Sequence, residues 1–363
     1  MGNVRRWRVR ALVGTTIVLA SVLASVSQVR AQESARELLG LWAAQRSFGP
    51  EVRGPVALRE VDGQLWAEIS GYSVAARVSD GEIRFEVPGD RGYFRGRVSA
   101  DGRMIDGHWV QPRTYSSFAR LASPVILTRQ AAGVWTGTVT PREDGLHFYL
   151  MMEKADNGRV RAFLRNPEAN IGRFYPIDEV VQEGDAVRFL DADGRVRLEG
   201  TYDAGFDRLS VYFPLNGGTY DFARAEADPA VPFYPRPRGG EPYRYRQPPA
   251  GEGWQTGRPE AVAMAVAPLE EMIRKIIATP MDAIDAPYIH GVLIARDGKL
   301  VVEEYFHGYS RHVPHATRSA AKSVTTTLVG IADHEGILDL DTPVYQTLYD
   351  GAPPGDLDPR AGR

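Results

Sequence analysis

The sequence predicts a multidomain protein in which an all-β region comes first and a smaller region with helices follows. Residues 35–225 indicate strands, because short segments of alternating apolar and polar residues are separated by Gly, Asp and Asn. Such turns recur roughly every 8 to 12 residues, as in antiparallel all-β domains. After residue 258 the apolar residues instead recur at helical spacing, and a Pro-rich stretch lies between the two regions.

Residues 1–31 have the pattern of a secretory signal peptide. The first ten residues hold four arginines, residues 11–26 are an apolar run, and Val29-Arg30-Ala31 is a small-residue cleavage pattern before Gln32. An uncleaved membrane anchor is the competing interpretation, but the run is short for a span of about 20 residues. We therefore expect an exported protein, periplasmic or secreted, without a stable membrane span after cleavage.

The β region, residues 32–225, contains an internal duplication with copies at about 35–122 and 128–225. Gly-Leu-Trp at 40–42 corresponds to Gly-Val-Trp at 133–135, and Ile-Arg-Phe at 83–85 corresponds to Val-Arg-Phe at 187–189. The offset grows between these matches, which places an insertion in the second copy around residues 165–178. Two copies of four or five strands each could close into one barrel or pack as a sandwich, and either solution shields the strand edges.

Four tryptophans of the β region are candidates either for a core or for a ligand-binding wall: Trp42, Trp66, Trp109 and Trp135. A barrel of about eight to ten strands is wide enough to hold a small ligand. Aromatic side chains nevertheless supply a large share of any β core, so we expect these four residues to be core residues.

Residues 226–258 form a Pro-rich linker, which we expect to be extended and stiff. The region 259–363 then begins with an amphipathic helix over residues 269–277, followed by a hairpin that turns at Asp297-Gly298. A last helix is predicted within Thr317 to Ile337. Val324, Leu328 and Ile331 make one apolar stripe on it, and we expect this helix to be buried.

Ser319 and Lys322 stand three residues apart at the start of this last helix, so both side chains project from one face. Burial and the positive end of the helix macrodipole both disfavour an ammonium, so we expect a neutral amine that can take the proton of Ser319. The chain holds 43 Lys and Arg residues, of which four are lysine, and an arginine could not be deprotonated. The competing interpretation is an ordinary serine and a solvated lysine on a surface helix.

The segment Thr317-Arg318-Ser319-Ala320-Ala321-Lys322-Ser323 resembles the active-site helix of serine β-lactamase-related hydrolases, a family that includes class C β-lactamases, penicillin-binding D,D-peptidases and esterases. Tyr-Arg-Tyr-Arg at 243–246 and Gly-Trp-Gln-Thr-Gly at 253–257 resemble the segment that precedes the family's catalytic domain. The resemblance implies that residues 259–363 are the N-terminal part of a β-lactamase-like α/β domain, with Ser319 as nucleophile and Lys322 as base. The family's Tyr-x-Asn or Ser-x-Asn triplet and its Lys-Thr-Gly or His-x-Gly strand are not found after Lys322. We interpret the chain as truncated after the Ser-x-x-Lys helix and expect it to be inactive in this form.

The leading hypothesis is an exported serine hydrolase that acts on an amide or ester bond through an acyl-enzyme, with a small-molecule or peptide substrate and no metal or organic cofactor. The cysteine count of zero excludes a thiol nucleophile and disulfides, and the net charge of −3 with dispersed charges argues against nucleic acid. His307, His312 and His315 are interpreted as loop residues and not as zinc ligands. The alternative is a periplasmic binding or sensor protein that uses the β domain, with a non-catalytic serine module. The sequence leaves the oligomeric state open.

Overall fold

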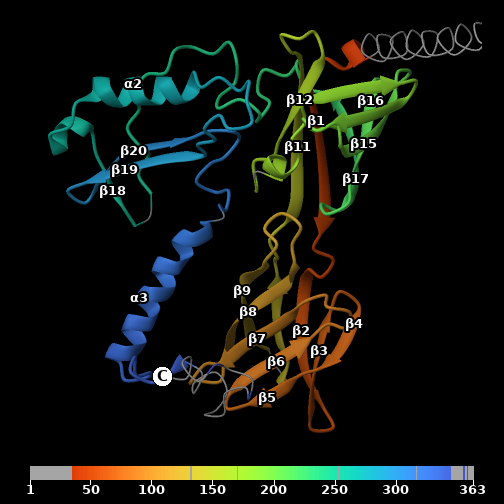
Figure 1. The fold of residues 1–363 in the computed structure, drawn as a ribbon. Coiled ribbons are helices and arrows are strands. Elements are labelled where there is room, and N and C mark those ends of the chain that lie inside the picture. The colour runs from red at the N-terminus through yellow and green to blue at the C-terminus, as the bar shows by residue number, and fades with distance from the viewer. Residues whose placement is uncertain are drawn as a thin grey trace, which may run out of the picture. The chain divides into compact units, whose positions relative to one another are not determined.

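The computed structural model describes residues 35–130, 133–169, 171–251, 253–315, 317–344, 355 and 358 (Figure 1). The predicted signal peptide, residues 1–31, lies outside the described residues. The chain divides into two compact units, of which the first extends to His312 and the second begins at Val313. No helix in the described part of the chain is long and apolar enough to cross a membrane.

The first unit contains a nine-stranded antiparallel sheet with the order β4-β3-β2-β10-β9-β8-β7-β6-β5. The strands alternate buried and exposed side chains, which is the period-two pattern of a sheet with one face on a core. Their bounds are β2 Gly54–Val61, β3 Gln64–Ile69, β4 Tyr72–Ala75, β5 Arg77–Ser79, β6 Glu82–Glu86, β7 Tyr93–Val98, β8 Met104–Arg113, β9 Arg120–Arg129 and β10 Trp135–Val139.

An eight-stranded antiparallel sheet in the same unit has the order β12-β11-β1-β17-β16-β15-β14-β13. A short 3-10 helix, η1 (Arg36–Leu38), precedes its first strand, and a second, η3 (Ile171–Phe174), lies between β12 and β13. The strand bounds are β1 Gly40–Gly49, β11 Asp144–Lys154, β12 Val160–Arg165, β13 Glu179–Glu183, β14 Ala186–Leu190, β15 Val196–Asp203, β16 Arg208–Phe213 and β17 Gly218–Arg224.

The two repeat copies exchange their first strands. β1 belongs to the first copy in sequence, but it pairs with β11 and β17, where Trp42 lies opposite Leu150 and Arg224. β10 opens the second copy and pairs with β2 and β9 of the first. The boundaries of the sheets therefore differ from the boundaries of the repeats, because each copy donates its opening strand to the sheet of the other.

Both sheets are nearly closed and barrel-like. In the nine-stranded sheet the two edge strands, β4 and β5, are joined through Ala76 alone, so the sheet must curl to bring its edges together. In the eight-stranded sheet the edge strands β12 and β13 are joined by residues 166–178. The insertion expected in the second copy falls in this connection. The all-β prediction for the N-terminal region is confirmed, whereas the expected closure of both copies into one barrel or one sandwich is wrong, because the two sheets close separately around their own cores.

Each sheet has its own hydrophobic core. Phe148 stacks on Phe213 with ring centroids 4.5 Å apart in the eight-stranded sheet, and Phe85 stacks on Phe94 at 5.2 Å in the nine-stranded sheet. Trp42 and Trp109 are fully buried, as predicted, and Trp135 packs against the core from a partly buried position. The prediction is wrong for Trp66, which is 36% exposed on β3.

The rest of the first unit is a three-stranded sheet with one α-helix. The strands are β18 (Gln255–Thr256), β19 (Gly291–Arg296) and β20 (Lys299–Tyr305), and β20 lies in the middle of the sheet. The 3-10 helix η4 (Pro259–Val262) leads to α2 (Val266–Ile277), whose Leu269 and Ile273 pack with Val301 and Phe306 of the same core. The predicted hairpin is present, since Asp297 and Gly298 turn between β19 and β20 with φ values of 49° and 73°.

In the described part of the second unit, the 3-10 helix η5 (Arg318–Ala320) leads into the helix α3 (Ala321–His334), and neither has a buried residue. The expectation of a buried helix is wrong, because Val324, Leu328 and Ile331 are 62%, 59% and 48% exposed. Helical periodicity sets which residues share a face, and it does not specify what covers that face.

The prediction of a β-lactamase-like α/β domain, and with it the resemblance to β-lactamase-related hydrolases, is corrected by the fold. An α/β domain needs helices that cover both faces of a central sheet. The regular secondary structure of the described residues is nearly all β, in barrel-like sheets, with two α-helices, and only α2 packs on the small three-stranded sheet. The resemblance rested on the helix motif at residues 317–323 and on two short segments before it, and such short motifs are compatible with more than one fold.

Candidate functional site

Ser319 and Lys322 lie where η5 runs into α3. The structure brings their side chains together, since Lys322 Nζ is 3.2 Å from Ser319 Oγ. Residues three apart on a helical turn face the same side, which explains how the sequence spacing sets this contact. The residue before the serine, Arg318, has a φ of 51°, a left-handed conformation that is uncommon for a residue other than glycine. Such backbone strain concentrates at functional sites.

The hydroxyl of Ser319 differs from three threonine hydroxyls further along the helix. Thr325, Thr326 and Thr327 each donate a hydrogen bond to the carbonyl oxygen four residues earlier, at distances of 2.9 to 3.2 Å. These three hydroxyls are therefore occupied by the helix backbone. Ser319 instead has an amine as its partner, and this amine can exchange a proton with it.

Both members of the pair are exposed within the second unit. The burial that the sequence predicted for Lys322 is not observed, since α3 has no buried residue. The N–H of Ala320 bonds to the carbonyl oxygen of Thr317 at 3.1 Å, so this N–H is not available to stabilise an oxyanion. In this contact Lys322 Nζ donates to Ser319 Oγ, so transfer of the hydroxyl proton to the amine would require Lys322 to release a proton first.

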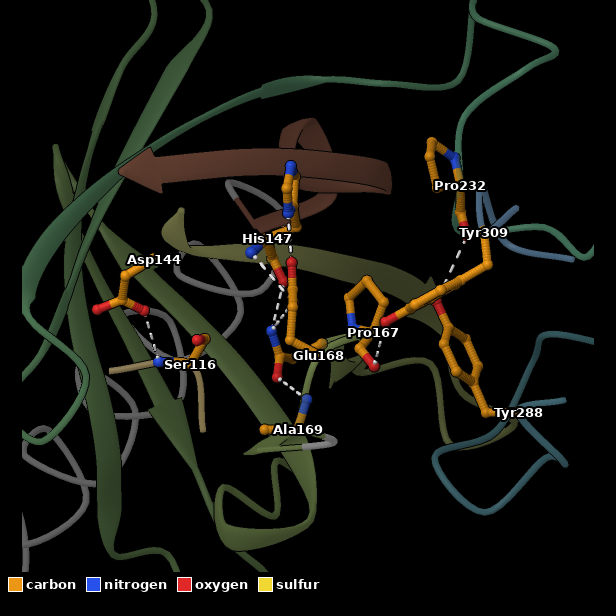
Figure 2. Close-up of polar contacts among 10 residues, drawn as sticks. Ser116, Asp144, His147, Pro167, Glu168, Ala169, Pro232, Tyr288 and Tyr309 are labelled. Carbon is orange, nitrogen blue, oxygen red and sulfur yellow. Dashed lines mark hydrogen bonds and ion pairs between the residues drawn. The ribbon is translucent and has the colours of Figure 1, made fainter. Parts of the chain in front are cut away.

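A second polar cluster lies in the first unit, in the connection that closes the eight-stranded sheet (Figure 2). Glu168 accepts a short hydrogen bond from the His147 ring at Nδ1 and another, at 2.6 Å, from Asn166 Nδ2. Asn166 Nδ2 also donates to the His147 carbonyl oxygen at 2.8 Å, and its own Oδ1 accepts from the Ala169 N–H at 2.9 Å. The donors of residues 147 and 166 hold the Glu168 carboxylate in place, which gives it a structural role.

Stacked aromatic rings continue from this cluster into residues 288–309. Tyr288 stacks on His307 with centroids 3.9 Å apart, and His290 stacks on Tyr309 at 4.1 Å. Tyr309 reaches back to the insertion, because its hydroxyl donates to the Pro167 carbonyl oxygen at 3.4 Å (Figure 2). Burial, followed by the negative charge of Glu168, raises the pKa of Tyr309 to about 12.

His307 lies in a turn, as interpreted from the sequence, and it is buried in this stack. Burial lowers the pKa of His307 to about 4, so the ring is neutral at ordinary pH. Its Nδ1 lies 3.0 Å from the Pro232 carbonyl oxygen, to which it donates. The cluster and its stacks therefore form the contact through which the end of the first unit packs on β11 and β12.

Sequence reasoning did not find the Glu168 cluster, because His147 lies about twenty residues before Asn166 and Glu168 and no regular spacing relates them. A metal site is not formed either: among the described residues, no three His, Asp or Glu side chains converge on a point where an ion could be held.

Comparisons with known proteins do not assign the chain to a family. No family model matches the chain, and no curated protein matches it. A matching solved structure is a protein of unknown function from the DUF3598 family of Nostoc punctiforme. It is 12% identical, with 53% of this chain and 96% of that chain covered, and its TM-score of 0.11 is too low to carry an argument. The predicted membership of the β-lactamase-related family is therefore supported by neither the fold nor a relative.

Proposed function

We propose that this protein is a serine hydrolase that cleaves an amide or ester bond. The expectation of an inactive chain depended on the resemblance to β-lactamase-related hydrolases, which the fold corrects, and it is not part of this proposal. Ser319 Oγ attacks the carbonyl carbon of the substrate while the Lys322 amine takes the hydroxyl proton, and that proton then goes to the leaving amine or alcohol. Water hydrolyses the resulting acyl-enzyme, with Lys322 as the base again, and this step releases the acid and regenerates the serine. The observation that carries the proposal is the 3.2 Å distance between Nζ and Oγ.

The substrate we propose is a small molecule or a peptide, and the chemistry needs no metal or organic cofactor, because the amine supplies the base. The pattern of residues 1–31 supports export as part of the proposal, with the hydrolase acting in the periplasm or outside the cell.

A ligand-binding role for the β region is a weaker candidate. Such a role needs space inside a sheet, and the side chains that would line it are packed instead. Trp42 and Trp109 are fully buried among other core residues, and Phe148 and Phe213 stack on each other. The interiors of both sheets are therefore built as cores.

Covalent labelling with a fluorophosphonate tests the proposal, because the reagent needs only an activated serine. Intact-mass measurement should show one adduct on the wild-type protein and none on Ser319→Ala. Ser323→Ala is the matched control, since Ser323 lies one turn further along the same exposed helix, and it should label normally. Labelling that persists in Ser319→Ala would refute the assignment of the nucleophile.

The role of Lys322 is tested by the rate of the same reaction. Lys322→Arg keeps the charge and removes the base, because arginine is not deprotonated in proteins. We expect labelling to slow by about 100-fold or more, the contribution of a positioned general base. Lys275→Arg, on the exposed face of α2, should leave the rate unchanged. Equal rates for Lys322→Arg and wild type would show that the amine is not the base.

A further inference from the structure

A cleft of about 920 Å³ lies in the first unit, between the coil of residues 234–246 and the C-terminal end of α2. Two glutamates line it, Glu241 and Glu304, and five arginines also line it. The arginines are Arg236, Arg238, Arg244, Arg246 and Arg274. The lining therefore carries an excess of positive charge, although the whole chain has a net charge of −3.

The sequence Tyr243-Arg244-Tyr245-Arg246 builds one wall of this cleft by alternation along an extended segment. The tyrosines turn inward: Tyr243 donates to Glu304 at 2.7 Å, and Tyr245 donates to the Val301 carbonyl oxygen at 2.9 Å. The arginines between them are exposed and line the cleft. Packing of the tyrosines thus fixes the backbone that presents the two guanidinium groups.

Part of the positive charge is already compensated inside the protein. Arg236 forms an ion pair with Glu304, and Arg274 forms an ion pair with Glu270. Arg244 is different, because its side chain is 80% exposed and its distance to the shared Glu270 is 3.9 Å. Arg236 also keeps a buried Nε without a hydrogen-bond partner. The buried Nε of Arg236 is out of reach of a ligand, whereas the exposed Arg244 retains donors that a ligand could use.

We propose that this cleft binds a small multivalent oxyanion, a ligand with two or more phosphate or carboxylate groups. The planar fork of arginine matches both groups with paired hydrogen bonds. A cleft of this volume also lies in the range of small-molecule sites, which favours a ligand of that size. The C-terminal end of α2 carries partial negative charge, so the arginine side chains must supply the attraction.

Isothermal titration calorimetry with inorganic pyrophosphate and with citrate tests the site and separates the two chemistries. We expect at least one of them to bind, with an affinity that falls as salt is raised. Arg244→Gln/Arg246→Gln should weaken binding by about tenfold or more, since charge-assisted hydrogen bonds are lost. Both side chains are exposed, so this variant should fold.

The control is Arg77→Gln/Arg103→Gln, which removes the same charge from exposed positions on the nine-stranded sheet. It should bind like the wild type. Absence of binding by both anions overturns the proposal. An equal loss of affinity in the two double variants also overturns it, because binding would then follow net charge and not the cleft. Neither outcome depends on the reactivity of Ser319.

Discussion

Replacement of Trp42 by alanine tests the strand exchange between the two sheets. Trp42 is fully buried, its ring meets Tyr202 edge-on at 6.0 Å, and its Nε1 donates to the Leu38 carbonyl oxygen at 2.8 Å. Loss of a buried tryptophan side chain costs about 3–5 kcal/mol. The hydrogen bond that is lost adds about 1 kcal/mol. We therefore expect Trp42→Ala to lower the free energy of unfolding by about 4–6 kcal/mol.

Urea unfolding measures this loss, and amide hydrogen exchange shows where it falls. Because Trp42 lies on β1, which pairs with β11 and β17, protection should be lost in those strands and kept in β2 and β9. Trp66→Ala is the control, since Trp66 is 36% exposed on β3. This substitution should lower the free energy of unfolding by only about 1–2 kcal/mol.

A milder variant keeps the test valid if Trp42→Ala does not fold. Trp42→Phe retains a buried ring and removes the donor to Leu38, so we expect a loss of about 1–3 kcal/mol with the same pattern of exchange. Faster exchange in β2 and β9, with β11 and β17 unchanged, would show that β1 pairs within its own repeat copy and would refute the exchange.

Two further predictions concern the contact around the insertion. His307 is neutral when folded, with a pKa of about 4 against about 6.5 when unfolded, so its contribution is complete above pH 6.5 and is lost as the pH falls toward 4. His307→Gln should therefore reduce the change in the free energy of unfolding across this pH window by up to about 3 kcal/mol, measured by urea unfolding at several pH values. His108→Gln, at an exposed position, is the control and should leave this change as it is in the wild type. Gly172→Ala places a Cβ 1.7 Å from the Leu164 carbonyl oxygen and should cost about 2 kcal/mol or more, measured by the same unfolding assay. A matched Gly205→Ala, whose nearest neighbour is a side-chain atom at 3.3 Å, should cost less, and equal losses would contradict the clash.

Local patterns in the sequence were sufficient to predict local structure. Alternation gave the strands, Asp297-Gly298 gave the hairpin, and the growth of the offset between the copies located the insertion. The partner of each strand could not be predicted, because a Gly-x-Trp start marks a strand without marking its neighbour. Exchange of β1 and β10 leaves the alternation of apolar and polar residues in both strands unchanged, so the exchange cannot be predicted from this pattern.

The same limit applies to the candidate site. The contact of Ser319 with Lys322 follows from helix geometry, and three residues of spacing are enough to predict it. The surroundings of the lysine depend on which elements pack on α3, and an apolar stripe does not contain that information. The Glu168 cluster is still harder to predict from the sequence, because it joins residues from β11, from the insertion and from the segment before α3.

The connections that close the two sheets differ, and this difference explains why residues 283–309 pack on the eight-stranded sheet. In the nine-stranded sheet the closing connection is Ala76, which is buried and has no side chain long enough to reach another element. The insertion at the same place in the eight-stranded sheet provides Pro167, which accepts a hydrogen bond from Tyr309, and the adjoining Arg165 donates to the Ala283 carbonyl oxygen. Duplication alone would have produced two equivalent closures. The added residues make the second closure a binding surface for residues 283–309. The neutral His307, the stacked tyrosines and the buried Arg165 guanidinium, which lies over the Tyr288 ring, fill that surface.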